Sequence, residues 1–390
     1  YRRNMLFKQY QLLGEIQFGY VSYFSKSETF SVANFLRLLD HVSSFQPEDI
    51  FSICYIPSLF IYVSRLEALS DQSVENLHKN FISTINGIEK LSESPFKALI
   101  ILVFLTHFID WCKQQPQRTL KFEFNTSVDE PMQKCISVGA LEQLLSITAD
   151  TSIITKSTKH NIKPFYDFRA FLQQHIPRFL PIRMFDIDQD ATLRKKQLLQ
   201  QQKVSGIDTS DSDLLPVYSI PDDISLTENF INFLVPVLSN FIHSFISTAA
   251  FMMTQLRDTE EDVLLSSDDF NLELLTENAD LERLYMSMYY LYSEREQYSK
   301  EFWADTNSAS YGFLQWASRC NSPLIMSTFS MVLAALASGN ENAINLFSFL
   351  QMTNSNYSNI MTNPRENSTL LTKYSSISWS TIYSTLSYYN

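Results

Sequence analysis

The stretch EFWADTNSASYGFLQWASRCNSPLIMSTFSMVLAALASG, residues 301–339, carries the strongest local signals in the chain. It holds two of the four tryptophans, Trp303 and Trp316. A serine followed by Pro323 is typical of a helix start, because serine caps the first turn and proline fits its first position. Gly339 closes an apolar run and is typical of a helix end. The stretch therefore predicts a helix, a break and a second helix.

The same helical signals recur in other parts of the chain. Apolar residues are spaced i, i+3, i+4 and i+7, which puts them on one face of a helix. A second serine–proline pair, at Pro95, marks another helix start. Residues 281–300 predict one longer helix, in which Glu296 and Lys300 are spaced for an i,i+4 ion pair. The clearest apolar stripes lie in residues 32–42, 59–69 and 74–88.

Composition agrees with helices. Hydrophobic residues make up 45% and aromatic residues 14% of the 390, so the chain can bury a large core. It has only 7 glycines, although tight hairpins and phosphate-binding loops depend on glycine. Only Leu120, Phe122 and Phe124 alternate as in a strand. We predict an all-α fold, an α-solenoid superhelix of stacked HEAT/armadillo-like helical pairs with irregular loops, although the sequence has no fixed repeat period. Compact helical bundles are the alternative.

The chain divides into four predicted parts. Residues 1–185 form a helical solenoid segment, and residues 186–226, rich in charge, glutamine and proline, form a linker or mobile insertion. Residues 227–352 form a second solenoid segment. Residues 353–390 begin as a loop rich in serine, threonine and asparagine that leads into a further segment. Because the chain starts with Tyr1 inside a predicted helix, we expect it to be an internal fragment of a longer protein.

Charge and hydropathy limit the classes of partner. The net charge is −12, and residues 257–282 alone hold ten acidic residues and one basic residue. This argues against a direct nucleic-acid groove there. Residues 229–256 lack charge and are long enough to span a membrane. They contain Asn232, Pro236 and His243, however, which favours a helix buried in a helical array. We therefore predict that the chain does not span a membrane.

The sequence offers little catalytic chemistry. No phosphate-binding loop, dinucleotide-binding glycine motif, nucleophile elbow or HExxH zinc motif occurs. Asp186, Asp188 and Asp190 imitate the start of a calcium loop, but the required glycine and the twelfth-position glutamate are replaced by alanine and glutamine. His107 and Cys112 lie five residues apart, which suits packing better than metal binding. We predict no enzyme activity, no metal and no cofactor.

The motifs of the opening stretch resemble one family. Their order is similar to a signature of the largest inner-ring scaffold nucleoporins of the nuclear pore complex, and the chain resembles fungal members from the N-terminal half. The resemblance covers residues 291–349. Large aromatic residues within it would anchor one helix pair on the next. The signature residues are Phe302, Trp303, Asp305, Gly312, Phe313, Leu314, Trp316, Pro323 and Gly339. Leu333, Leu336, Ala337 and Ser338, which precede Gly339, complete the motif.

The resemblance implies a structural role at the nuclear envelope. Such scaffolds are α-solenoids that hold the inner ring together, bind short linear segments of other inner-ring and linker nucleoporins, and support nucleocytoplasmic transport of protein and mRNA, with transport receptors as further partners. The resemblance does not locate a partner groove, so no partner-binding residue is assigned. Two alternatives stay open, a karyopherin-like transport receptor solenoid and a helical regulatory protein without catalytic activity.

Overall fold

A computed structural model describes residues 2–27, 29–44, 50–87, 91, 94–114, 117–118, 128–151, 226–249, 252–256, 258, 279–318 and 323–360. Within these ranges all regular structure is helical and no strand occurs. The all-α prediction is confirmed. The strand-like residues 120–124 and the imitation calcium loop lie outside the described ranges, as does the linker predicted for residues 186–226, apart from Leu226.

The N-terminal half of the described chain consists of seven α-helices and three short 3-10 turns. One 3-10 turn follows α1, and the other two lie directly before and shortly after α3. The helices are α1 (Arg2–Phe24), α2 (Val32–Ser43), α3 (Ile56–Ser64), α4 (Asp71–Asn86), α6 (Pro95–Lys113), α9 (Asp129–Ser137) and α10 (Ala140–Asp150), and the turns are η1 (Ser25–Ser27), η2 (Ile50–Tyr55) and η3 (Leu66–Ala68).

The C-terminal half begins with the long helix α15 and continues with five helices that follow one another closely. Their bounds are α15 (Glu228–Thr248), α18 (Asp280–Tyr292), α19 (Glu296–Ala304), α20 (Ala309–Ala317), α21 (Pro323–Leu336) and α22 (Asn340–Ile360). The opening stretch of the sequence therefore spans the end of α19, all of α20 and α21, and the turn before α22.

The predicted helix signals act as expected. In α2, Phe35 and Leu39 are fully buried on the apolar stripe, and the Ser31 hydroxyl accepts a hydrogen bond from the Asn34 amide at 3.3 Å. In α6, the Ser94 hydroxyl accepts from the Lys97 amide at 3.4 Å, and Pro95 occupies the first turn. Each capping hydroxyl satisfies one of the amide groups that a helix start leaves without a partner.

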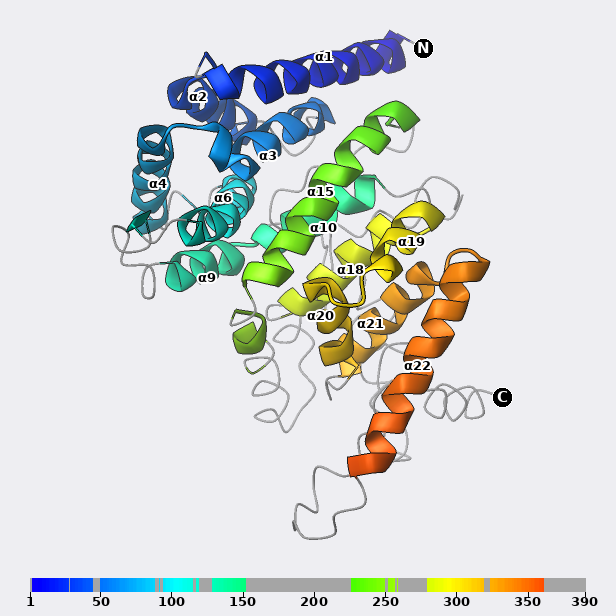
Figure 1. Cartoon of the computed structure of the whole chain (residues 1–390). Coiled ribbons are helices and arrows are strands. Elements are labelled where there is room, and N and C mark those ends of the chain that lie inside the picture. Colours follow the sequence, from blue (N-terminus) through cyan, green and yellow to red (C-terminus); the bar gives the residue numbers. More distant parts are fainter. Residues whose placement is uncertain are drawn as a thin grey trace, which may run out of the picture.

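Neighbouring helices stack from one end of the molecule to the other. α1 packs on α3, α3 on α6, α6 on α9 and α10, α10 on α18, α18 on α21, and α19 on α22. α1 and α22 lie at opposite ends (Figure 1). This order agrees with stacked helices, whereas winding into a superhelix stays a prediction.

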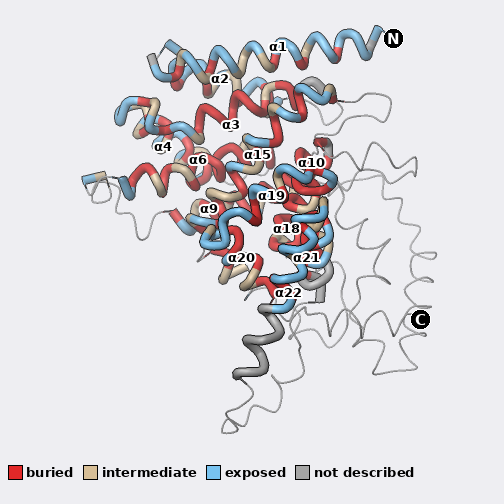
Figure 2. The backbone as a smooth tube through the Cα atoms, turned by 45° about the vertical axis from the view of Figure 1, so that its right-hand side comes forward, coloured by how far each residue is buried: buried red, intermediate tan, exposed pale blue. Residues whose placement is uncertain are grey.

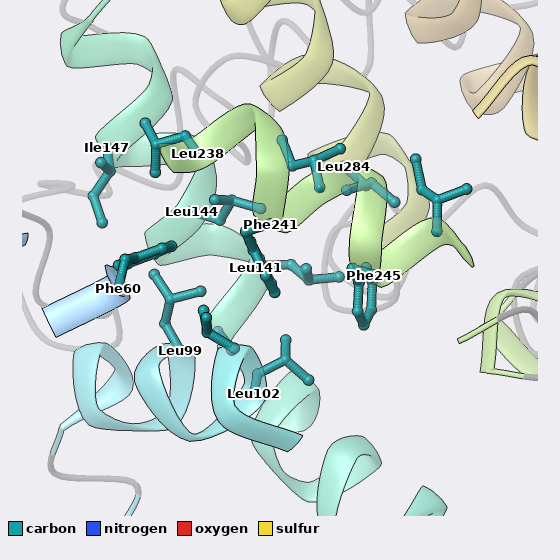
Figure 3. Packing of buried hydrophobic residues seen from close by; sticks show 14 of the residues in the cluster. Phe60, Leu99, Leu102, Leu141, Leu144, Ile147, Leu238, Phe241, Phe245 and Leu284 are labelled. Carbon is teal, nitrogen blue, oxygen red and sulfur yellow. The ribbon is translucent and has the colours of Figure 1, made fainter. Parts of the chain in front are cut away.

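Helix α15 contacts helices from both halves of the chain and joins them. It packs on α1, α3 and α6 on one side and on α18 and α20 on the other (Figure 1). Figure 3 shows the resulting core, in which Phe241 of α15 lies among Phe60 of α3, Leu99 of α6 and Leu141 of α10. At the start of α15, the Gln11 side chain accepts a hydrogen bond from the Thr227 amide at 2.8 Å, across 216 positions of sequence. The two predicted segments therefore share one hydrophobic core.

Two helices, α6 and α15, are long and apolar enough to cross a membrane by length and composition alone. In the fold, 83% of the apolar window of α6 and 50% of that of α15 is buried. Figure 2 shows α6 at the centre of the stacked helices, where most of its residues are buried. Burial against neighbouring helices accounts for the apolar sequence of α6.

The single helix predicted for residues 281–300 is wrong. α18 ends at Tyr292 and α19 starts at Glu296. Between them Glu294 adopts a positive φ of 58°, a conformation that non-glycine residues rarely take. The expected pairing also changes, because the Lys300 amine lies 2.7 Å from the carboxylate of Glu341 on α22 rather than pairing with Glu296.

Residues 353–360, which the sequence assigns to a loop, are helical. α22 continues through residues 353–360 and ends at Ile360. Serine and asparagine are weak helix formers, but extending a helix that already exists fixes few further dihedral angles for each hydrogen bond gained. The remainder of that segment, residues 361–390, lies outside the described ranges.

Candidate functional site

The turn between α19 and α20 is held by its own side chains. The Asp305 carboxylate accepts a hydrogen bond from the Asn307 amide at 3.0 Å. The Ser308 hydroxyl accepts from the Tyr311 amide at 3.2 Å and caps α20. Both contacts are local, so this sequence makes the turn without help from distant residues. The turn leaves Asp305 exposed at the end of α19.

Trp303 joins four helices. Its side chain is 6% exposed, and its indole nitrogen donates a hydrogen bond to the Leu336 carbonyl at 2.9 Å. That carbonyl lies in the last turn of α21, where helical carbonyls have no partner within the helix. The indole ring also contacts Tyr311 of α20 and Phe349 of α22, with ring centroids 6.1 and 6.0 Å apart. The residue therefore fixes α19 against α20, α21 and α22.

Gly339 makes the turn between α21 and α22. Its φ is +89°, a region that strongly favours glycine. A β-carbon at this position would lie 2.3 Å from the Glu296 carboxylate, so this exposed side chain of α19 would have to move to make room. Nearby, the buried Asn342 amide donates to the carbonyls of Ser338 and of Glu296, the latter at 3.1 Å. The turn is thereby tied to the start of α19.

Most of the remaining signature residues on α20 pack against other side chains, and one has no structural explanation. Phe313 stacks between Tyr285 and Trp316, with ring centroids 5.1 and 5.4 Å apart, and Leu314 is fully buried. Trp316 itself is only half-buried. Gly312 lies on α20 with open space around it, and nothing in the structure explains its glycine.

These residues therefore do not form one site. Phe302 packs against Trp303, which with Gly339 forms the joint between α19, α21 and α22. Phe313 and Trp316, in contrast, stack towards α18. Pro323 is the first residue of α21. Asp305 lines a cavity that the sequence did not predict.

The cavity measures about 210 Å³ and lies between α15, α18, α19 and the turn before α20. We call it the acidic cavity. Its floor is formed by the buried aromatic residues Tyr292 and Phe302, and its rim carries the exposed carboxylates of Glu301 and Asp305. The remaining lining residues are the partly buried Ser239, His243, Tyr298 and Ser308.

A chain of hydrogen bonds crosses one wall of the acidic cavity. The Tyr292 hydroxyl lies 3.0 Å from Nε2 of His243, and Nδ1 of His243 contacts the Ser310 hydroxyl. Burial lowers the pKa of His243 below its ordinary value of 6.5. Burial also raises the pKa of Tyr292 above its ordinary value. A neutral imidazole, with one nitrogen donating and the other accepting, fits these contacts.

The chain of contacts links helices rather than exposing a nucleophile. His243 belongs to α15, Tyr292 to the last turn of α18, and Ser310 to the first turn of α20. Ser310 is 1% exposed, so its hydroxyl has no access to a substrate. Little in the amino-acid sequence indicates this cluster. His243 was the single ionisable group in a long uncharged stretch, but its partners are 49 and 67 positions away.

The chain also contains buried titratable groups in α6. Burial lowers the pKa of His107 to about 4 and raises the pKa of Cys112 to about 12. Both therefore stay neutral near pH 7. Among the described residues, no group of three or more histidine, cysteine, aspartate or glutamate side chains has a geometry that could hold a metal ion.

Comparison with known proteins identifies relatives. The family model described as "Nuclear pore complex scaffold, nucleoporins 186/192/205" matches residues 1–390. Nucleoporin nup186 of Schizosaccharomyces pombe is 20% identical over 339 residues, which cover 83% of this chain and 18% of that protein. Nucleoporin NUP192 of Chaetomium thermophilum is 28% identical over 152 residues, which cover 39% of this chain and 8% of that protein.

The aligned parts span less than a fifth of the length of either relative. The similarity nevertheless extends well beyond residues 291–349, the part in which the sequence alone carries a sharp motif. Because the family model covers every residue, the chain belongs to the family of nuclear pore complex scaffold proteins that comprises nucleoporins 186, 192 and 205.

Proposed function

We propose that this chain is a helical segment of the structural scaffold of the nuclear pore complex inner ring. The match of all 390 residues to the scaffold family is the observation that carries the proposal. The stacked helices support it, since a shared core and a bridging helix make an extended element of fixed shape. The protein would reside at the nuclear envelope and support nucleocytoplasmic transport through the shape it gives the ring.

We further infer that the segment acts by binding and not by catalysis. In the described residues, the polar side chains of the types that often serve in catalysis form hydrogen bonds within the fold. Ser310 and His243 connect helices, and Arg295 donates to the backbone carbonyls of Tyr290, Leu291 and Thr151. Groups that stabilise internal joints are not placed to act on a substrate.

The finer proposal is that short segments of other nucleoporins bind on the outer faces of the helices. One feature that supports further protein contact is the outer face of α1, where apolar side chains stay exposed at helical spacing. Contiguous exposed apolar surface often marks an interaction site. The most exposed of these side chains, with their exposed fractions, are Leu12 at 57%, Leu13 at 58%, Ile16 at 61% and Tyr23 at 72%.

Photobleaching tests the scaffold role. The whole protein, of which this chain is a part, would be tagged with a fluorescent protein in its own cells and bleached at the nuclear envelope. A scaffold component should recover slowly, because it leaves only when the ring comes apart. A transport receptor tagged in the same cells provides the fast control. Recovery as fast as that control would contradict the scaffold role and favour the karyopherin-like alternative.

A further inference from the structure

The acidic cavity has the size of a side-chain pocket. Ordinary small-molecule sites measure about 300–1,000 Å³, and one water takes up about 30 Å³ of liquid. At about 210 Å³ the cavity is smaller than the first and much larger than the second. One long side chain of a partner protein suits this volume better than a free cofactor does.

Two carboxylates give the rim its charge. Glu301 lies in the last turn of α19 and Asp305 directly after it, and both line the cavity. Both are exposed. Glu301 accepts a hydrogen bond from the Gln297 amide at 3.0 Å, and Asp305 accepts from the Asn307 amide at 3.0 Å. Neither carboxylate forms an ion pair with a residue in the described part of the chain.

The basic residues near this rim are engaged elsewhere. The buried guanidinium of Arg295 donates to three backbone carbonyls, including those of Tyr290 and Leu291 at 2.8 and 2.9 Å. The Lys300 amine lies 2.7 Å from the Glu341 carboxylate. Burial raises the pKa values of Tyr292 and Tyr298, and the negative charge of Glu301 adds to both shifts, whereas Arg295 lowers the pKa of Tyr298.

The floor adds a second requirement. Tyr292 and Phe302 are buried, and their ring centroids are 5.6 Å apart at an angle of 72°. Tyr298, beside Glu301, is partly buried and supplies a third ring. An occupant must therefore combine a positive charge at the rim with a flat or apolar portion against aromatic rings. A guanidinium group does both, since it forms paired hydrogen bonds with carboxylates and stacks on aromatic faces.

We propose that the acidic cavity receives an arginine side chain from a linear segment of a partner protein, with its guanidinium held between Glu301 and Asp305 over the aromatic floor. The proposal rests on the proposed scaffold function and adds to it the chemistry of the bound segment. It also assigns a second role to Asp305, the exposed acidic residue of the signature, whose carboxylate holds the turn before α20 through its hydrogen bond from the Asn307 amide.

A counter-selected peptide library tests the proposal with the intact chain. Random peptides would be selected on the wild-type chain and depleted on the double variant Glu301→Gln/Asp305→Asn, so that only peptides that need these carboxylates remain. We expect the remaining peptides to share an arginine. Replacing that arginine by citrulline, which has nearly the same shape without the charge, should weaken binding at least tenfold.

Matched controls keep the result interpretable. Glu67→Gln removes an exposed carboxylate from η3, away from the cavity, and should bind the same peptides as the wild type. The double variant should unfold close to the wild-type temperature, because both replaced side chains are exposed and each new amide keeps an oxygen that can accept the hydrogen bond of the carboxylate it replaces. Remaining peptides without a common arginine, equal binding of the citrulline peptide, or no remaining peptides would overturn the proposal. Because photobleaching tests the scaffold role separately, slow recovery combined with a failed selection would overturn this inference alone.

Discussion

The indole nitrogen of Trp303 lies 2.9 Å from the carbonyl oxygen of Leu336, and this hydrogen bond joins the last turn of α19 to the last turn of α21. The donor and acceptor are 33 positions apart in sequence. One side chain thus satisfies a buried carbonyl and fills the space between four helices. The joint is the part of the fold in which the signature residues contribute most directly to stability.

Replacing Trp303 should therefore destabilise the chain strongly. Trp303→Ala empties a buried aromatic site, and we expect a loss of about 3–5 kcal/mol in the free energy of unfolding. Trp303→Phe keeps most of the volume but leaves the Leu336 carbonyl without its donor, which should cost about 1–3 kcal/mol. Urea denaturation followed by circular dichroism measures both.

Trp316→Ala is the matched control for this prediction. Trp316 stacks on Phe313 but is only half-buried, so its loss should cost clearly less than that of Trp303. The sequence alone placed Trp303 and Trp316 together as packing anchors, and the structure distinguishes them by burial. Equal destabilisation by the two alanine variants would show that the hydrogen bond and burial of Trp303 are not decisive.

Gly339→Ala should also destabilise the joint. An alanine at a φ of +89° is strained, and its β-carbon would meet the Glu296 carboxylate. We expect a loss of about 1–3 kcal/mol. Gly312→Ala provides the opposite control, because a β-carbon there meets nothing within 4 Å in the middle of α20. That variant should gain roughly 0.5–1 kcal/mol from better helix propensity.

The two causes of the Gly339 effect can be separated. Glu296→Ala removes the crowding carboxylate without changing the backbone at Gly339. If the Gly339→Ala/Glu296→Ala variant recovers most of the stability lost in Gly339→Ala, crowding by the Glu296 side chain is the main cause of the loss. If it recovers little, the backbone conformation dominates. A Gly339→Ala variant as stable as the wild type would refute the need for glycine at this turn.

Local features of the fold could be predicted from the sequence, and non-local ones could not. The stripe through Phe35 and Leu39 and the start of α6 at Pro95 depend on spacing and capping within a few residues. The break at Glu294 had no such signal, since no glycine or proline marks it. The next residue, Arg295, is buried and donates to carbonyls of α18 and to that of Thr151, just after α10, which no local pattern indicates.

The acidic cavity was hidden for the same reason. Tyr292 and His243 are 49 positions apart, on helices that no local pattern brings together. Only the family resemblance points to Asp305, and its place on the cavity rim depends on the packing of α15 against α18 and α20. Local sequence patterns indicate the apolar face of a helix, but they do not indicate which residues of different helices meet at one cavity.

Arg295 offers a prediction about the contact between the two halves of the chain. Its side chain is buried, and it donates to Tyr290 and Leu291 at the end of α18 and to Thr151 just after α10. Arg295→Met would keep the bulk of the side chain and leave these buried carbonyls without donors. Each unsatisfied buried acceptor costs about 1–3 kcal/mol, so the variant should be strongly destabilised.

Lys300→Met is the control for Arg295→Met. It removes the ion pair with Glu341, in which both side chains are exposed to solvent. Exposed ion pairs contribute little to stability, so this variant should unfold close to the wild-type temperature. Thermal unfolding of the two variants side by side measures the difference. Similar unfolding temperatures would mean that the carbonyl contacts of Arg295 do not stabilise the fold.

Histidine burial predicts a loss of stability in mild acid. Burial lowers the pKa of His107 from 6.5 to about 4 and also lowers the pKa values of His78 and His243. Between these values the unfolded chain binds protons that the folded chain does not. The free energy of unfolding should therefore be highest above about pH 6.5 and should fall as the pH drops towards about 4.

The His107→Leu variant isolates one contribution to this pH dependence. Carboxylates also titrate in acid, so the informative quantity is the difference between variant and wild type, measured by urea denaturation at several pH values between about 7 and 4. Removing the histidine should make the decline of stability with falling pH shallower, because one group that protonates only on unfolding is gone. A slope in His107→Leu equal to that of the wild type would mean that His107 does not gain a proton when the chain unfolds.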